Sequence, residues 1–173
     1  MPRNAWLWLA GGAVLLYLLA TQTQTGEDVV AEITGGWRTA GEGPKWVPVL
    51  NVAETQYGIP KDLLARQAYQ ESHFRSDIIS GATVSPAGAQ GIMQLIPRFY
   101  PGVDPLDPAQ AITAAAESMA TYYRQFGSWA LALAAYNWGP GNVAKHGGDS
   151  SSWPAETQNY VAQITADVPG ANA

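Results

Sequence analysis

One glutamate stands out among the residues whose type and spacing could do chemistry. Residues 60–72 begin with a first-turn proline and are expected to form a helix. At about 100° per residue, Glu71 falls within about 20° of Leu64 on the apolar stripe, whereas Arg66 falls on the opposite, polar side. A carboxyl group on an apolar stripe is partly desolvated, which raises its pKa and suits a general acid. The competing interpretation is that Glu71, at the end of its helix, simply reaches water.

The composition limits what kind of site can accompany this glutamate. The chain has 173 residues, a net charge of −5 and no cysteine. The negative charge argues against a nucleic-acid partner, and the absence of cysteine excludes disulfides and thiolate metal sites. With only two histidines, a multi-histidine zinc site is excluded as well. We therefore expect no metal and no cofactor.

The first 21 residues differ from the rest of the chain. Residues 5–20 carry no charge and, as a helix, would span about 24 Å, slightly less than the hydrocarbon core of a bilayer. Arg3 lies before this segment and acidic residues follow it, an order that favours a domain outside the cytoplasm. We predict a membrane anchor over residues 1–21. A cleaved signal peptide and a buried helix are the alternatives.

The remaining chain divides into a linker and one helical domain. Residues 22–45 are polar and rich in glycine, which predicts a flexible linker. Residues 46–173 show helical periodicity and almost no strand pattern, so we predict a single all-α domain. The expected helices are 47–57, 60–72, 87–95, 108–126, 129–136 and 154–167.

Four short motifs occur in a fixed order along this domain. They are ESHF at 71–74, SPAGAQGIMQLIP at 85–97, AYNWGPG at 135–141 and ETQNYV at 156–161. Together they resemble the soluble lytic transglycosylase (SLT) family over about residues 47–168. The resemblance implies a lysozyme-like helical fold of the goose-type and SLT kind.

The resemblance also implies roles for the matched residues. Glu71 matches the family's catalytic acid and base. Five further positions match residues that bind the sugar or support the site, namely Ser85, Gln94, Tyr136, Asn137 and Glu156. Each of the last four also has a bland interpretation as a surface amide, a core tyrosine, a helix stop or a first-turn acid, respectively.

The position of the matching serine is ambiguous. The family usually places about nine residues between the glutamate and this serine, and Ser80 has that spacing here. Ser85 instead keeps its place relative to Gly88 and Ala89. We interpret residues 81–85 as a small insertion and predict Ser85.

The implied reaction explains how one carboxyl group could suffice. A lytic transglycosylase cleaves the β-1,4 bond between N-acetylmuramic acid and N-acetylglucosamine, and the C6 hydroxyl of the muramic residue closes a 1,6-anhydro ring. The nucleophile is intramolecular, so no second carboxylate is needed to activate water. The expected partners are peptidoglycan strands, a membrane and proteins of a virion or a secretion machine. A goose-type-like muramidase and a catalytically silent glycan-binding module are the alternatives.

Overall fold

The computed structural model of the chain describes residues 36–146 and 148–172. The predicted membrane anchor and most of the predicted linker lie outside these residues. Within the described ranges, no helix has the length and apolar character needed to cross a bilayer.

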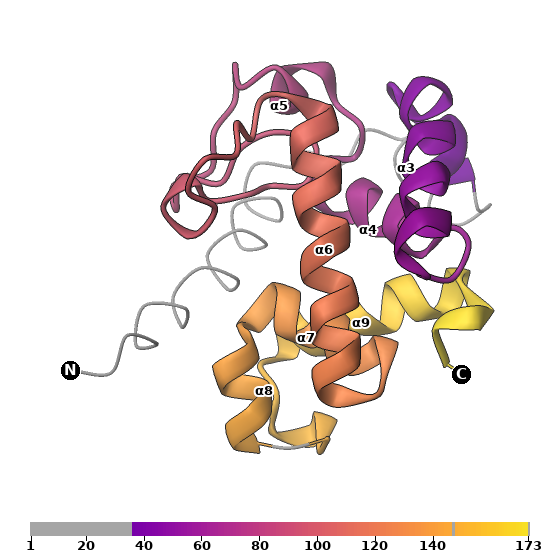
Figure 1. Cartoon of the computed structure of the whole chain (residues 1–173), viewed down its shortest axis with the longest axis vertical. Helices are drawn as coiled ribbons and strands as arrows, with labels where there is room; N and C mark the ends of the chain where they lie inside the picture. Colours follow the sequence, from indigo (N-terminus) through magenta and orange to yellow (C-terminus); the bar gives the residue numbers. More distant parts are fainter. Residues whose placement is uncertain (1–35, 147, 173) are drawn as a thin grey trace.

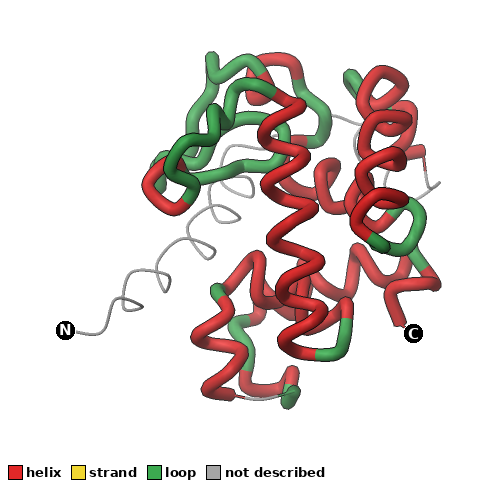
Figure 2. The backbone as a smooth tube through the Cα atoms, viewed as in Figure 1, coloured by secondary structure: helices red, strands yellow, loops and turns green. Residues whose placement is uncertain are grey.

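The described residues form an all-α fold, as predicted (Figures 1 and 2). Apart from one isolated bridge, Figure 2 shows helices joined by loops over these residues. The α-helices are α3 (Gly43–Tyr57), α4 (Leu63–Ser72), α5 (Ser76–Ile79), α6 (Pro108–Phe126), α7 (Trp129–Trp138), α8 (Pro140–His146) and α9 (Ala155–Asp167). Short 3-10 turns add η1 (Gly36–Thr39), η2 (Pro97–Phe99), η3 (Ser150–Ser152) and η4 (Pro169–Asn172).

Local capping signals set most helix ends where the sequence predicts them. Gly58 ends α3 with a left-handed φ of 68°. The side chain of Asp107 accepts the backbone N–H of Ala109 at 2.9 Å and so caps α6. Ser128 caps α7 in the same manner.

The helix predicted over residues 87–95 is wrong. This segment forms a looped turn closed by an antiparallel bridge between Gln90 and Leu95. Gly88, Gly91 and Gln94 have φ values of 81°, 72° and 47°, which no right-handed helix contains. A Cβ at Gly91 would lie 1.9 Å from the carbonyl oxygen of Pro105, so only glycine allows the two backbones to approach.

The helical domain begins earlier than predicted. We expected residues 36–45 to end a flexible linker, but η1 occupies residues 36–39 and α3 begins at Gly43, with a turn between them. Trp37 is 1% exposed and belongs to the hydrophobic core. The aromatic side chain supplies the apolar area that a flexible, glycine-rich segment would lack.

Helix α4 lies in the interior and has no solvent-facing polar side of the predicted kind. It contacts α3, α9 and η1, and Arg66 and Tyr69 are each only 1% exposed. Its first turn is capped by another helix, because the carboxyl group of Glu54 on α3 accepts the N–H groups of Asp62 at 2.7 Å and Ala65 at 2.9 Å. The helix that carries Glu71 is therefore held on several sides.

Candidate active site

Glu71 lies in the last turn of α4 and is 4% exposed. The helix ends at once after it, because His73 and Phe74 both adopt left-handed φ values of 50° and 52°. Such conformations cost free energy for residues other than glycine and are concentrated at functional sites. Because the residue is buried, the alternative interpretation that the Glu71 side chain reaches open water is wrong.

Tyr160 on α9 donates a hydrogen bond from its hydroxyl to Oε1 of Glu71 at 2.7 Å. Burial raises the pKa of Glu71 to about 8, against the lowering effect of this hydrogen bond. The negative charge of Glu156 raises the same pKa further. Glu71 is thus mostly protonated at pH 7 and can act as a proton donor.

Glu156 lies one helical turn before Tyr160 and faces the same region. Burial raises its pKa to about 7, and its Oε1 atom is buried without a hydrogen-bond partner among the described residues. The site therefore contains a second carboxyl group whose charge acts on Glu71.

Tyr136 on α7 connects the site to the loop over residues 85–97. Its hydroxyl donates to the carbonyl oxygen of Met93 at 2.9 Å. Burial raises the pKa of Tyr136 well above its usual value, and the nearby Tyr100 and Glu71 raise it further. This phenol consequently stays protonated and serves as a hydrogen-bond donor.

Tyr100, in the loop after η2, is a further half-buried phenol beside the glutamate. Burial raises its pKa, a hydrogen-bonding contact of 3.4 Å with the hydroxyl of Ser118 on α6 lowers it, and the charge of Glu71 raises it. Tyr122 lies one turn beyond Ser118, and burial followed by the neighbouring Tyr100 raises its pKa. Neutral phenols from α7, α9 and this loop therefore lie close enough to Glu71 to interact with its charge, and Tyr122 on α6 lies behind them beside Tyr100.

Three other predicted site residues form hydrogen bonds with neighbouring residues. Ser85 is 4% exposed, and its Oγ accepts the N–H of Ala89 at 2.8 Å. The amide nitrogen of Gln94 donates to the carbonyl oxygen of Gly91 at 2.9 Å. Oδ1 of Asn137 accepts the hydroxyl of Thr157 at 2.7 Å, which joins α7 to α9 behind Tyr136.

The two candidate serines differ clearly in environment. Ser80 is exposed at the end of α5, and its hydroxyl lies 3.4 Å from the carbonyl oxygen of Asp77. Ser85 is buried in a tight turn that ends at Ala89. The carboxyl group of Asp77 accepts bonds from Arg75 and Thr83, and so closes the loop that separates the two serines.

Comparison with known protein families identifies the family of the chain. The family model described as the transglycosylase SLT domain matches residues 48–159. The chain belongs to the SLT transglycosylase family. The predicted resemblance is thereby confirmed for the domain that contains all six predicted site residues.

One curated relative of this SLT chain is the membrane-bound lytic murein transglycosylase F 2 of Alkalilimnicola ehrlichii. The two are 34% identical over 110 residues, which cover 58% of this chain and 23% of the relative. The SLT chain thus spans less than a quarter of the relative that it matches.

Two residues of this SLT site were missed as functional candidates. Tyr160 falls in the fourth motif, and its four-residue spacing from Glu156 places both on one side of a helix, a signal that could have identified it. Tyr100 follows a 3-10 turn in a loop, where no periodicity predicts which way a side chain points.

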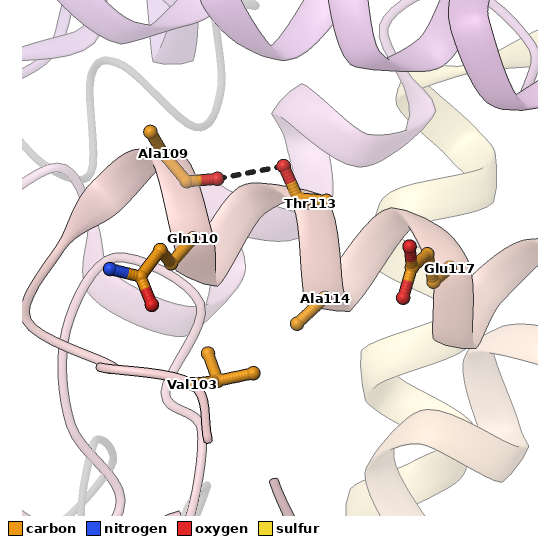
Figure 3. A pocket seen from close by; sticks show the side chains of 6 residues that line it. All are labelled: Val103, Ala109, Gln110, Thr113, Ala114 and Glu117. Carbon is orange, nitrogen blue, oxygen red and sulfur yellow. Dashed lines mark hydrogen bonds between the residues drawn. The ribbon is translucent and has the colours of Figure 1, made fainter. Parts of the chain in front are cut away.

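A separate hollow of about 340 Å³ lies along the first half of α6 (Figure 3). Its lining is mostly apolar and consists of Val103, Ala109, Gln110, Thr113, Ala114 and Glu117. The carboxyl group of Glu117 accepts the hydroxyl of Tyr57 at 3.1 Å. These lining residues differ from those around Glu71, so the hollow is distinct from the candidate site.

Proposed function

We propose that this SLT domain is a peptidoglycan lytic transglycosylase in which Glu71 is the single acid and base. The observation that carries the proposal is the buried carboxyl group of Glu71, hydrogen-bonded to Tyr160 and surrounded by neutral phenols. Since Oε1 accepts the phenol, the acid proton resides on Oε2. That atom faces the reacting bond in the proposed complex.

The proposed reaction needs no external nucleophile. Oε2 of Glu71 gives its proton to the glycosidic oxygen between N-acetylmuramic acid and N-acetylglucosamine, and the C1–O bond breaks. The leaving sugar departs with a C4 hydroxyl, and positive charge develops at C1 of the muramic residue. The C6 hydroxyl then attacks C1 while Glu71 removes its proton, which forms the 1,6-anhydro ring and restores the acid. The intramolecular position of the nucleophile supplies the rate advantage.

The other predicted residues have supporting roles in this proposal. Tyr136 and Tyr100 present phenols on one side of the reacting bond, while the loop with Ser85 and Gln94 binds the sugar. The left-handed φ of Gln94, at 47°, supports a binding role for that loop. Glu156 tunes the proton affinity of Glu71 through its charge.

A muramidase that uses water is the second candidate. Glu156 favours it, since a second carboxyl group close enough to raise the pKa of Glu71 could activate a water molecule. Digestion of wall sacculi with the full chain, followed by mass spectrometry, separates the two reactions. Anhydro ends support the transglycosylase, and reducing ends support the muramidase. Binding to sacculi without any product would mean a silent glycan-binding module.

Substitution of the proposed acid tests its role directly. We expect Glu71→Gln to lower turnover at least about 100-fold, because it removes the acid and base but preserves the shape of the side chain. The variant should retain its circular dichroism spectrum and melting temperature within a few degrees. Near-normal turnover of a folded Glu71→Gln protein would refute the assignment.

We propose that the predicted anchor over residues 1–21 and the linker after it hold the enzyme at the outer side of a membrane, where it opens the wall locally. Entry of a bacteriophage genome and assembly of an envelope-spanning machine both require such an opening. Removal of residues 1–21 should abolish fractionation with membranes but leave cleavage of isolated sacculi unchanged.

A further inference from the structure

A chain of hydrogen bonds ties α4 to α9 beside the bond at Glu71. Nε of Arg66 donates to Oδ2 of Asp167 at 2.6 Å, and the Arg66 side chain is 1% exposed. The same guanidinium donates through Nη1 to Oε1 of Gln70 at 2.8 Å. Nε2 of Gln70 then donates to Oε1 of Gln163 at 2.9 Å. The chain of bonds therefore crosses between the two helices twice.

These contacts define an antiparallel register of α9 on α4. Arg66 precedes Glu71 by about 7.5 Å along α4, and Asp167 follows Tyr160 by about 10.5 Å along α9, at a rise of about 1.5 Å per residue. A slip of α9 by one residue would move the Tyr160 hydroxyl by about that rise and rotate it by about 100°. A hydrogen bond of 2.7 Å would not survive such a change.

We infer that Arg66 is a positioning residue, which fixes α9 on α4 through Asp167 and thereby holds the Tyr160 hydroxyl on Glu71. A buried guanidinium without a partner strongly destabilises the folded protein. The Arg66–Asp167 pair therefore constrains the register of α9 on α4. The inference rests on the proposed function, in which Glu71 is the acid. Neither Arg66 nor Asp167 belongs to the four motifs that carry the resemblance.

Several polar and charged groups interact with Glu71, and a shift of α9 would move only some of them. Those on α9 are Tyr160 and Glu156, whereas Tyr136 on α7 and Tyr100 in the loop after η2 stay in place. The hydrogen bond of Tyr160 depends on tenths of an ångström, while the charge of Glu156 acts over a longer range. Loosening α9 should therefore raise the pKa of Glu71 on balance.

The test compares Asp167→Asn with Asp62→Asn in the full chain. Asp62→Asn is a matched control, because it removes a partly exposed ion pair with Arg38 at the other end of α4, and asparagine tolerates the left-handed φ of 69° at this position. We expect Asp167→Asn to lower kcat about tenfold, with KM within twofold, and to move the alkaline limb of the pH profile upward. Asp62→Asn should change neither kcat nor the limb by more than about twofold.

A double-mutant cycle with Tyr160→Phe separates positioning from general stability. If Arg66 acts through Tyr160, Asp167→Asn should lower kcat by less than about twofold in the Tyr160→Phe background. An equal loss in both backgrounds, or an unmoved alkaline limb, would overturn the inference. Should Asp167→Asn not fold, the variant Arg66→Met with Asp167→Asn removes the buried guanidinium together with its partly exposed partner and should fold. It should then show the same loss of kcat.

The positioning role can also be tested if the chain does not have the proposed activity. Titration of the Glu71 carboxyl group by carbon-13 NMR reports the effect of Asp167→Asn without any turnover. A wild-type chain that produces no anhydro ends refutes the proposed function alone. A Glu71 titration that is identical in Asp167→Asn and wild type refutes the positioning role alone.

Discussion

The Tyr160 hydroxyl lies 2.7 Å from Oε1 of Glu71, although the two residues are 89 positions apart in the sequence. The bond opposes the effect of burial, because a donor stabilises the carboxylate that desolvation disfavours. In the proposed reaction Glu71 gives up a proton and then regains one, so neither its protonated nor its ionised form can be too stable. The opposing effects of the Tyr160 hydrogen bond and of burial together determine the pKa of Glu71.

Substitution of Tyr160 by phenylalanine should change both the pKa of Glu71 and the turnover. Without the donor, the pKa of Glu71 rises above its value of about 8, and the alkaline limb of the kcat profile moves to higher pH. Loss of a hydrogen bond to a charged group costs about 1.5–3 kcal/mol, so turnover at neutral pH should fall about 10–100-fold. A limb that moves to lower pH would contradict this account.

Substitution of Glu156 by glutamine should shift the limb in the opposite direction. Its charge raises the pKa of Glu71, so the uncharged amide lowers that pKa and moves the alkaline limb of kcat to lower pH. The pH profile with sacculi as substrate measures the shift. In the double variant with Tyr160→Phe, the two shifts should partly cancel. Shifts of the same sign in both single variants would refute the roles of these two residues.

The site could be predicted from the sequence where its parts are local. The burial of Glu71 was predictable because helical periodicity places it among apolar positions, and the cap at Asp107 has a direct side-chain signal. The burial of Arg66 was not predictable, since its polar side faces α9, which begins nearly 90 residues later in the sequence. Packing against a helix distant in the sequence determines the environment of Arg66, and a local sequence pattern contains no information about such packing.

The conformation of the loop over residues 85–97 also could not be predicted from local sequence patterns. Its apolar residues suggested a helix, but three left-handed positions and the close approach of Gly91 to Pro105 produce a turn instead. The four motifs still predicted that this loop belongs to the site. Its contact through Met93 with Tyr136 agrees with that placement.

The two candidate serines provide a matched pair of variants. Ser85→Ala removes the acceptor of the Ala89 N–H and should lower the free energy of unfolding by about 1–3 kcal/mol, because it leaves a buried donor unpaired. We expect kcat/KM to fall about tenfold, since the loop beside the site loses its turn. Ser80→Ala changes an exposed side chain and should stay within about 0.5 kcal/mol and twofold. Equal effects of the two variants would contradict the assignment of Ser85.

Glu54 offers a test of how α4, the helix that carries Glu71, is held in place. Both of its oxygens accept N–H groups at the start of α4, from the N-cap residue Asp62 and from Ala65. In Glu54→Gln one acceptor becomes an NH₂ group that faces an N–H donor. The free energy of unfolding should therefore fall by about 1–3 kcal/mol at pH 5, measured by urea denaturation. Glu117→Gln, an exposed carboxyl that accepts one phenol, is the control and should change it by less than about 0.5 kcal/mol.

The pH dependence of the Glu54 effect follows from its titration. Burial raises the pKa of Glu54 to about 7 against the lowering effect of the backbone N–H groups of Ala65, Asp62 and Leu64, so the folded state favours the protonated form more than the unfolded state does. The stability that this group contributes is complete below the ordinary pKa of about 4.5 and is lost as pH rises through about 7. Glutamine does not titrate, so the stability deficit of Glu54→Gln should shrink between pH 5 and pH 8. A deficit that grows over this range would mean that these N–H groups outweigh burial and that Glu54 caps α4 as a carboxylate.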